Sequence, residues 1–505
     1  MSSTVETLSK KLSWLPPGLS RWMERRMKSI PALRKMVEKE QEDITATLEH
    51  SLKPYHNTFE RHKILPKQGI ERGKIMDDIR KMHELESSRW QEGYVSGGIY
   101  HGDAEHIKFL NEVYALHSQS NPLHSDLFPS ATKMEAEIVS MVATMLGKGQ
   151  TTDNKDVVGT VTSGGTESIL LAMKTYRDRA LEEKGIEYPE MIVATTAHAA
   201  FDKASQYFGI KMVRVGIDEN FRMNVKEAKQ AINRNTIVIV GSAPTFPHGA
   251  IDPIKELSDL ALANDIGFHT DCCLGGFVIP FAEKAGINVP IVDFRLPGVT
   301  SISVDTHKYG YAAKGTSVIL YRGESLRHFQ FYTITDWPGG LYFSPTLAGS
   351  RPGALSAACW ASLLSMGEDG YTKASKSIVE TANQIKAGIK TIPELKLFGD
   401  PLFVIAFGSD TVNVYEVLDQ MTNRKWNLNG LHKPSCVHIA VTLRHTQPGV
   451  AERFISDLRD SVEYVKANPG NKEGSAPVYG MAASLPFRGM VSDILKKYLD
   501  VVYKA

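Results

Sequence analysis

SVDTHKYG, residues 303–310, places one lysine between a histidine and a tyrosine at the end of a short β-branched run. A glycine follows at position 310, so a turn is expected directly after the run. A lysine at the end of a strand is usually a solvated charge. The meaning of Lys308 therefore depends on the residues that the fold brings beside it.

Short apolar runs alternate with helical stretches between about residues 155 and 325. The runs are VVGTVT (157–162), MIVATT (191–196), MVRVGI (212–217), TIVIVGS (236–242), GFHTD (267–271), SISVD (301–305) and TSVILY (316–321). Such alternation predicts an α/β fold with a mainly parallel seven-stranded sheet covered on both faces. Ligands of these sheets bind beyond the carboxyl ends of the strands, so the residues just after each run are candidate site residues.

The pattern changes beyond about residue 370, and 505 residues exceed what one core usually holds. A long helix is followed there by LFVIAFG, a second helix and VHIAVTL, which predict a smaller C-terminal α+β domain. The predicted regions are an N-terminal helical extension (1–60), an N-terminal segment (61–150), a large ligand-binding domain (151–365) and the small domain (366–505).

Composition excludes several function classes. The net charge of +1, with 42% apolar and 23% charged residues, is ordinary for a soluble globular protein and indicates no nucleic-acid partner. The four cysteines, Cys272, Cys273, Cys359 and Cys436, lack CxxC spacing, so we expect reduced thiols, a cytoplasmic location and no metal site. No apolar run reaches the 18 residues of a membrane span, and the N-terminus lacks a signal-peptide pattern.

The segment LSWLPPGLSRWMERRMKSIPALRKMVEKE, residues 12–40, has the pattern of a basic amphipathic helix. One interpretation is a helix that lies on a membrane surface. The interpretation that we prefer is an arm that packs on the body of the protein or on a second subunit. Charge alone does not decide between them.

The run that ends at residue 162 leads through Ser163, Gly164, Gly165 and Thr166 into a helical stretch. Glycines at this point allow backbone N–H groups to face an anion at a helix N-terminus, where the helix dipole also favours negative charge. The alternative is a tight turn without a ligand. Neither GxxxxGK[ST] nor GxGxxG is present, so the segment does not indicate a nucleotide or dinucleotide site.

Three other strand ends carry His198, the pair His269 and Asp271, and the pair His307 and Lys308. With the anion-binding segment they predict a site for pyridoxal 5'-phosphate. Lys308 would form the Schiff base, and we expect burial beside the cofactor to keep its amine neutral enough to react. Asp271 would hold the pyridine nitrogen protonated. His198 would stack on the ring, unless it is only a loop histidine, and His307 would reach the cofactor phosphate or a reacting hydroxyl.

The motifs GTVTSGGTESI, AHAAFDKA, GSAPTFPHG, HTDCCLGGF and SVDTHKYG resemble the group of enzymes with the pyridoxal phosphate-dependent transferase fold, type I, that includes glutamate and aromatic amino acid decarboxylases. Within that group SGGIYHGDAEH, NPLHSDLFPS, TDWPGGLYFSPTLAGSRPG and APVYGMA are similar to sphingosine 1-phosphate lyases. The resemblance runs from about residue 60 to the end. Eukaryotic lyases carry a transmembrane anchor ahead of this region, so this sequence is expected to be similar to the soluble bacterial members or to a shortened form.

The resemblance implies retro-aldol cleavage of phosphorylated long-chain bases to a long-chain aldehyde and phosphoethanolamine. It assigns substrate binding, chiefly of the phosphate, to Tyr100, His124, Lys314, Tyr342, Arg351 and Tyr479. It also places Gly349, Ser350 and Arg351 in a loop that approaches the cofactor of the neighbouring subunit, which implies a homodimer with shared sites. Residues 61–150 would then contribute to the substrate site and the dimer.

Two rival functions stay open. An amino acid decarboxylase on the same scaffold would need Lys308 and Asp271 but has no evident use for Tyr100, His124 and Lys314. A non-catalytic protein that binds lipid or protein partners would not need a reactive lysine at all.

Overall fold

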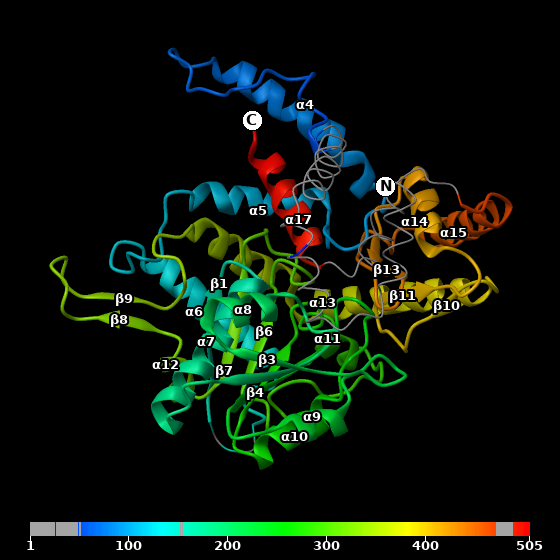
Figure 1. Ribbon diagram of the computed structural model, residues 1–505. Coiled ribbons are helices and arrows are strands. Elements are labelled where there is room, and N and C mark those ends of the chain that lie inside the picture. Colours follow the sequence, from blue (N-terminus) through cyan, green and yellow to red (C-terminus); the bar gives the residue numbers. More distant parts are fainter. Residues whose placement is uncertain (1–25, 27–48, 50–51, 152, 154, 471–487) are drawn as a thin grey trace.

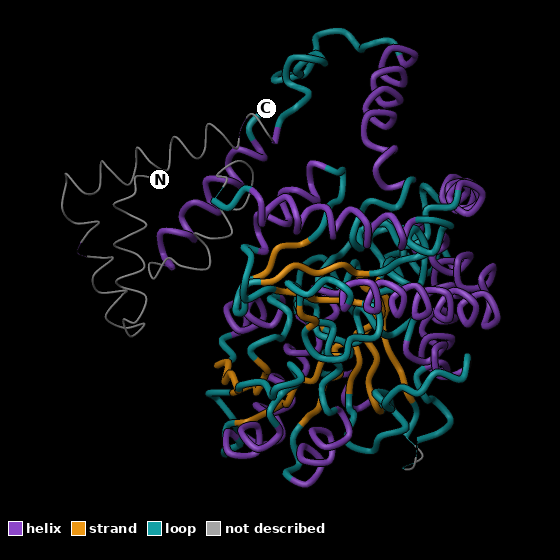
Figure 2. Tube along the Cα trace, turned by 90° about the vertical axis from the view of Figure 1, so that its right-hand side faces the viewer, coloured by secondary structure: helices purple, strands orange, loops and turns teal. Residues whose placement is uncertain are grey.

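The computed structural model describes residues 26, 49, 52–151, 153, 155–470 and 488–505. A large sheet with helices on both faces forms its centre, and a smaller sheet with its own helices lies beside it (Figures 1 and 2). Except for Arg26, the predicted N-terminal helix at residues 12–40 lies outside the described residues.

The large sheet is built from seven strands in the order β1-β7-β6-β5-β4-β2-β3. Their bounds are β1 (Val157–Thr162), β2 (Glu190–Ala194), β3 (Lys211–Val215), β4 (Thr236–Ser242), β5 (Gly267–Asp271), β6 (Ser301–Val304) and β7 (Ser317–Arg322). Strand β7 runs antiparallel to both β1 and β6, and the other pairings are parallel. The predicted mainly parallel seven-stranded sheet is confirmed.

Alternate side chains of β1, β2 and β7 enter two separate hydrophobic clusters, one on each face of the sheet. In β1, Val157 and Val161 pack in the first cluster, whereas Val158 packs in the second. Because successive side chains of a strand point to opposite faces, a sheet with helices on both sides needs continuous apolar runs. This requirement explains the mostly apolar runs of β1, β2, β4 and β7, whereas β6 alternates serine with apolar residues.

Different helices cover the two faces (Figure 2). Residues of α7 (Gly165–Lys184), α8 (Ala200–Phe208) and α12 (Glu324–His328) pack in the second cluster. Residues of α6 (Pro129–Met145), α9 (Val225–Ala231), α10 (Ile254–Ala263), α11 (Ile279–Lys284) and α13 (Gly353–Lys390) pack in the first. Helix α7 follows β1 directly, so its N-terminus lies at the strand ends where a ligand is expected.

The C-terminal part forms an antiparallel four-stranded sheet in the order β10-β11-β13-β12. Its elements are β10 (Lys396–Leu397), β11 (Val404–Gly408), α14 (Val414–Asn423), β12 (Asn429–Leu431), β13 (Cys436–Ala440) and α15 (Val450–Ala467). Helix α13 leads into this part and is interrupted at Gly367, whose φ of 58° lies outside the helical range. The predicted boundary at residues 365/366 falls close to this break, and the domain limits stay predictions.

Two segments extend from the body. The N-terminal α4 (Arg72–Gln91) projects outward at the top of Figure 1, above α5 (Ala104–Leu116) and the C-terminal α17 (Arg488–Tyr503) in that view. The hairpin of β8 (Tyr332–Ile334) and β9 (Tyr342–Ser344) projects from the large domain. No helix in the described ranges is long and apolar enough to cross a membrane. All four cysteines are free and buried.

Two histidines are buried where the loop after β4 meets the small domain. His248 is 2% exposed, its ring lies 4.6 Å from that of Phe221, and neither ring nitrogen has a hydrogen-bond partner among the described residues. His438 is fully buried, and its Nδ1 donates to the carbonyl oxygen of Pro247 at 3.0 Å. Burial lowers the pKa of each imidazole to about 4, and for His248 the nearby His438 adds to this effect.

We expect the free energy of unfolding to decrease as pH falls from about 6.5 toward 4. The folded chain keeps both rings neutral, whereas the unfolded chain binds protons below the ordinary histidine pKa of about 6.5. One such histidine then costs roughly 2–3 kcal/mol near pH 4. His248→Phe keeps the aromatic packing and removes one titration, so denaturant unfolding should show a smaller loss over this range. His62→Gln, at an exposed position, is the control; equal losses for His248→Phe and the parent would contradict the prediction.

Candidate active site

Lys308 follows the end of β6 and is held by a buried acid. Its Nζ lies 2.7 Å from Oδ2 of Asp305, whose side chain is 2% exposed. Burial lowers the pKa of Lys308, but the Asp305 carboxylate outweighs this effect and the net shift is upward. The expectation that burial keeps this amine neutral is therefore wrong for the chain alone, because the sequence argument left out the acid three residues earlier.

Asp271 is the last residue of β5 and is 7% exposed. Its Oδ1 accepts hydrogen bonds from the Cys273 N–H at 3.1 Å and from the Ser303 hydroxyl at 3.4 Å. No lysine, arginine or histidine forms an ion pair with it in the part of the chain that the structure describes. A buried carboxylate with neutral donors alone is costly, and a cationic ring nitrogen would compensate its charge.

The predicted anion-binding segment lies at the start of α7. A Cβ on Gly165 would come within 2.6 Å of Asp305 Oδ1 and 2.9 Å of Cys273 Sγ, so only glycine lets the chain pass this close to the site. Both the N–H and the hydroxyl of Ser163 donate to Oε2 of Glu167, at 2.7 and 2.6 Å. The backbone N–H groups of Gly165 and Thr166 have no acceptor among the described residues, and Gly165 lies beside the acid that binds Lys308. Thr166 is exposed at the same turn.

Two further predicted histidines follow strands β2 and β6, which are separated in the sheet by β4 and β5. His198 is exposed after β2, and its Nδ1 accepts the Ala200 N–H at 3.1 Å. The Nδ1 of His307 contacts the carbonyl oxygen of Thr316 at 2.5 Å. Because a carbonyl only accepts, Nδ1 carries the proton and Nε2 of a neutral ring is left as an acceptor. Burial lowers the pKa of His307, which favours this neutral form.

His269 is placed differently from the other predicted cofactor contacts. It is fully buried in β5, and its two ring nitrogens contact Ser301 and Ser303 of the adjacent β6. Its ring therefore lies on the same face of the sheet as Asp271, two residues earlier in β5 and beside Phe201 of α8. Direct cofactor contact by His269 stays a prediction.

Tyr100, His307, Lys308 and Lys314 line one cavity of about 230 Å³. The Nζ of Lys314 lies 4.5 Å from the centre of the Tyr100 ring, an arrangement typical of a cation–π contact. Although Lys314 is exposed as a residue, partial loss of hydration and the nearby Lys308 lower its pKa to about 8. Burial raises the pKa of Tyr100, so its hydroxyl stays protonated as a donor.

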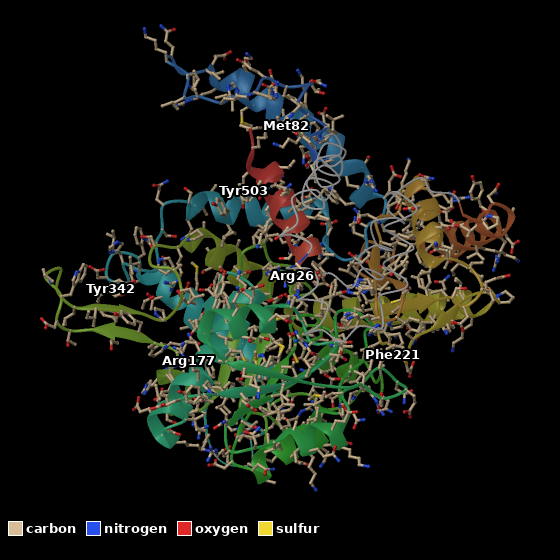
Figure 3. All side chains as sticks on the ribbon, in the orientation of Figure 1. Arg26, Met82, Arg177, Phe221, Tyr342 and Tyr503 are labelled. Carbon is tan, nitrogen blue, oxygen red and sulfur yellow. The ribbon has the colours of Figure 1, made fainter. Side chains whose placement is uncertain are left out.

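Other predicted substrate residues do not line this cavity. His124 is exposed in the loop before α6, and Tyr342 lies on the projecting hairpin (Figure 3). Arg351 donates to Oε2 of Glu135 on α6 at 2.7 Å, and both side chains are largely buried. Gly349 and Ser350 lie in the same loop, between β9 and α13. Tyr479 lies outside the described residues.

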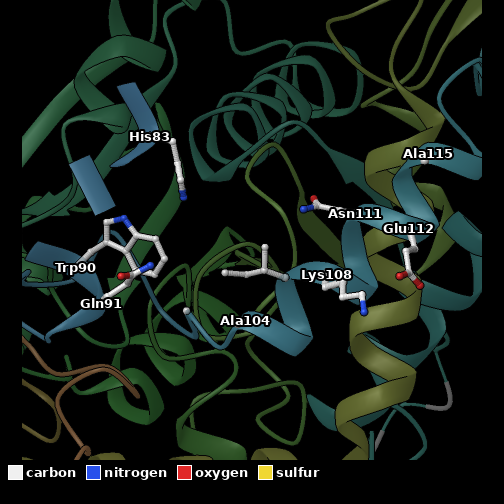
Figure 4. Close-up of a pocket in the computed structure, with 10 residues that line it drawn as sticks. His83, Trp90, Gln91, Ala104, Lys108, Asn111, Glu112 and Ala115 are labelled. Carbon is white, nitrogen blue, oxygen red and sulfur yellow. The ribbon is translucent and has the colours of Figure 1, made fainter. Parts of the chain in front are cut away.

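A second cavity of about 550 Å³ adjoins the first, between α4 and α5 (Figure 4). His83, Trp90 and Gln91 line it from α4, and Lys108 and Asn111 from α5 (Figure 4). The two cavities share Trp90, Gly102, Ile107 and Asn111. None of the predicted site residues lines this second cavity.

Sequence reasoning missed two acids. Asp305 lies within the motif SVDTHKYG, three residues before Lys308. This spacing could have predicted an ion pair between the two side chains. Glu167 is buried, and besides Ser163 it accepts the Leu347 N–H at 2.9 Å. It therefore fastens the loop that carries Gly349 and Ser350 to the first turn of α7. The TSGGTES motif contains Glu167, but nothing in the motif indicates the distant partner.

These residues fit pyridoxal 5'-phosphate. A lysine amine follows β6, a carboxylate that lacks a cation partner among the described side chains ends the adjacent β5, and a glycine-built helix N-terminus lies against the acid that binds the lysine. The three groups match an aldehyde, a ring nitrogen and a phosphate.

Comparison with known proteins identifies the family. Residues 56–407 match the model of the pyridoxal-dependent decarboxylase conserved domain. The sphingosine-1-phosphate lyase of Arabidopsis thaliana is 45% identical over 489 residues, which cover 94% of this chain and 87% of that protein. The lyase of Saccharomyces cerevisiae is 41% identical over 493 residues, which cover 96% of this chain and 83% of that protein.

Comparison with solved structures gives the same family. A sphingosine-1-phosphate lyase from Burkholderia pseudomallei superposes with a TM-score of 0.83 at 41% identity, over 90% of this chain and 99% of that chain. A glutamate decarboxylase from Lactobacillus brevis, at 20% identity and a TM-score of 0.68, shares the fold over 82% of this chain and 97% of its own. The chain therefore belongs to the pyridoxal-dependent decarboxylase family and, within it, to the sphingosine-1-phosphate lyases.

Proposed function

We propose that this chain cleaves the C2–C3 bond of sphingosine 1-phosphate and related phosphorylated long-chain bases, giving a long-chain aldehyde and phosphoethanolamine. It is a lyase that depends on pyridoxal 5'-phosphate. The observation that carries the proposal is the single cavity in which Lys308 lies with Tyr100 and Lys314. A decarboxylase that acts on an amino acid has no phosphate for these two donors to bind.

When bound, the cofactor supplies an aldehyde for an amine and a ring that accepts the electrons of the breaking bond. Lys308 provides the amine that holds it, and the backbone of Gly164, Gly165 and Thr166 binds its phosphate. Asp271 binds the ring nitrogen. The exposed ring of His198 covers one face of the cofactor.

The remaining polar groups of the cavity act on the substrate. Lys314 and the Tyr100 hydroxyl bind the substrate phosphate, because a dianion is best held by a cation and a protonated hydroxyl. His307 accepts the C3 hydroxyl proton at Nε2, the nitrogen left unprotonated by the bond to Thr316. Asp305 keeps the proton of the Lys308 amine close to that amine when the lysine is free.

A homodimer with shared sites is part of the proposal. Large apolar side chains, each more than half exposed, lie on the hairpin and its flanks: Tyr332, Trp337, Leu341, Phe343 and Leu347. Exposed apolar surface of this extent is typical of protein interfaces. His124, Tyr342, Ser350 and Arg351 would then serve the partner's site, as would be expected of residues that do not line their own chain's cavity. Tyr479, which lies outside the described residues, is proposed to serve that site with them.

The location of the protein is inferred from its cysteines. Free, buried thiols agree with a reducing cytoplasmic compartment. We also propose that residues 12–40 make peripheral contact with membranes, because the proposed substrate is a lipid. Co-sedimentation with vesicles, with and without these residues, tests that contact.

Incubation with sphingosine 1-phosphate and mass analysis should show a long-chain aldehyde and phosphoethanolamine. Lys308→Ala should abolish both products, because no other amine holds the cofactor in position, whereas Lys396→Ala at an exposed ion pair should keep them. Release of carbon dioxide from glutamate or aromatic amino acids, without aldehyde, would favour the decarboxylase. Normal aldehyde release by Lys308→Ala would overturn the mechanism.

The value of kcat/KM for the phosphorylated substrate should decrease as pH rises through about 8. Lys314 is cationic below its pKa of about 8 and loses its charge above it. Lys314→Ala should lower kcat/KM by about tenfold to a hundredfold and abolish this decrease. Lys314→Arg keeps the charge at high pH and should show no decrease near pH 8. An unchanged pH profile in Lys314→Ala would remove Lys314 from the phosphate site.

Size-exclusion chromatography with light scattering should give twice the chain mass for the parent. Phe343→Glu places a charge on the exposed hairpin, so it should yield monomers that release little aldehyde. Leu262→Glu, at a 55% exposed position on α10, should stay dimeric and active. A fully active monomeric parent would contradict the shared site.

A further inference from the structure

A chain of buried side chains runs from Asp271 across β5 and β6 to α7. The Ser303 hydroxyl lies 3.4 Å from Asp271 Oδ1, and His269 Nε2 lies 3.1 Å from Ser303 Oγ. On the other side of the ring, His269 Nδ1 lies 2.7 Å from Ser301 Oγ, which lies 2.6 Å from the Tyr176 hydroxyl. His269 and both serines are completely buried, and Tyr176 is 1% exposed.

The donor inventory fixes the direction of this chain. A carboxylate only accepts, so the single hydroxyl proton of Ser303 points to Asp271, and Ser303 Oγ must accept from His269. His269 therefore carries its proton on Nε2, and its Nδ1 accepts from Ser301. The single Ser301 proton is then used on His269, so the Ser301 oxygen accepts from the Tyr176 hydroxyl at 2.6 Å, and the Thr300 hydroxyl can donate to Tyr176 at 2.7 Å. Every hydrogen bond from Tyr176 to Ser303 therefore donates in the direction of Asp271.

We propose that His269 is a positioning residue that acts through Ser303 to hold the Asp271 carboxylate in place for the cofactor ring nitrogen. The proposal rests on the proposed cofactor site but not on the identity of the substrate. It assigns to His269 a role behind the acid rather than at the cofactor surface.

The surroundings of the ring support this role. Burial lowers the pKa of His269 to about 4, against the opposing effect of Asp271, so the ring is neutral and one nitrogen is free to accept. His269 Nε2–H donates to one lone pair of Ser303, and the Cys273 thiol lies 3.4 Å from the same oxygen. Among the described residues, Asp271 is then the acceptor that remains for the Ser303 hydroxyl. Without His269 the hydroxyl could turn away from the acid.

Two matched substitutions separate positioning from packing. The amide nitrogen of His269→Gln reaches toward the place of Nε2 and can still donate to Ser303, whereas that of His269→Asn reaches only the place of Nδ1. Three quantities are measured on the purified enzyme with pyridoxal 5'-phosphate: the cofactor dissociation constant, the pH midpoint of the cofactor absorbance, and kcat with KM. Tyr176→Phe removes the hydrogen bond to Ser301, on the far side of His269 from Asp271. It serves as the control for a general loss of stability.

His269→Asn should raise the cofactor dissociation constant about tenfold, shift the absorbance midpoint and lower kcat at unchanged KM. His269→Gln and Tyr176→Phe should stay within about twofold of the parent with an unshifted midpoint. Ser303→Ala should reproduce the effect of His269→Asn, which keeps the test valid if the Asn variant does not fold.

The double variant His269→Asn with Ser303→Ala gives the sharpest outcome. If His269 acts through Ser303, the double variant binds the cofactor no more weakly than either single variant. The proposal would be overturned if the double variant raised the cofactor dissociation constant by the product of the two single effects. Equal behaviour of the Gln and Asn variants would also overturn it. Both cofactor measurements need no substrate, so a parent that binds cofactor but releases no aldehyde would refute the proposed function and leave this test intact.

Discussion

The buried charge of Asp271 is the constraint on which the site depends. The carboxylate ends β5 at 7% exposure, and only neutral groups donate to it among the described residues. Lys308, which follows the adjacent strand β6, is already paired with Asp305. A cationic group supplied by a ligand therefore restores the balance of charge, and a protonated pyridine nitrogen is such a group.

The large sheet makes this arrangement possible. Strands β5 and β6 pair in parallel, with Asp271 opposite Ser303, so the acid and the segment that leads to Lys308 leave the sheet side by side. Helix α7 begins at the same edge, because it follows β1 directly. Glu167 in its first turn fastens the loop after the hairpin, so the cofactor site and the proposed interface are linked by one buried carboxylate.

Much of the fold could be predicted because most strands of the large sheet are buried along their length and several read as apolar runs, although the edge strand β3 is partly exposed. The predicted run 267–271 coincides with β5, and that of 157–162 with β1. Lys308, Asp271 and the start of α7 could be found because they follow such runs. The antiparallel direction of β7 could not, since a strand carries no mark of its direction in its own residues.

Contacts between segments that are distant in the sequence could not be predicted either. The pairing of Arg351 with Glu135 joins residues more than two hundred positions apart, and the ring of His269 lies between serines of another strand. Asp305 differs from these cases, because it lies within the quoted motif and its pairing with Lys308 is local. Its charge reverses the expected state of the lysine, which a reading based on burial alone missed.

The most direct test of the central claim is borohydride reduction of the enzyme with bound pyridoxal 5'-phosphate, followed by digestion and mass mapping of the modified peptide. The account predicts that the cofactor mass is attached to Lys308 in the parent, and that Asp271→Asn retains less cofactor before reduction. Attachment at a different lysine, or equal cofactor retention without the Asp271 charge, would contradict it.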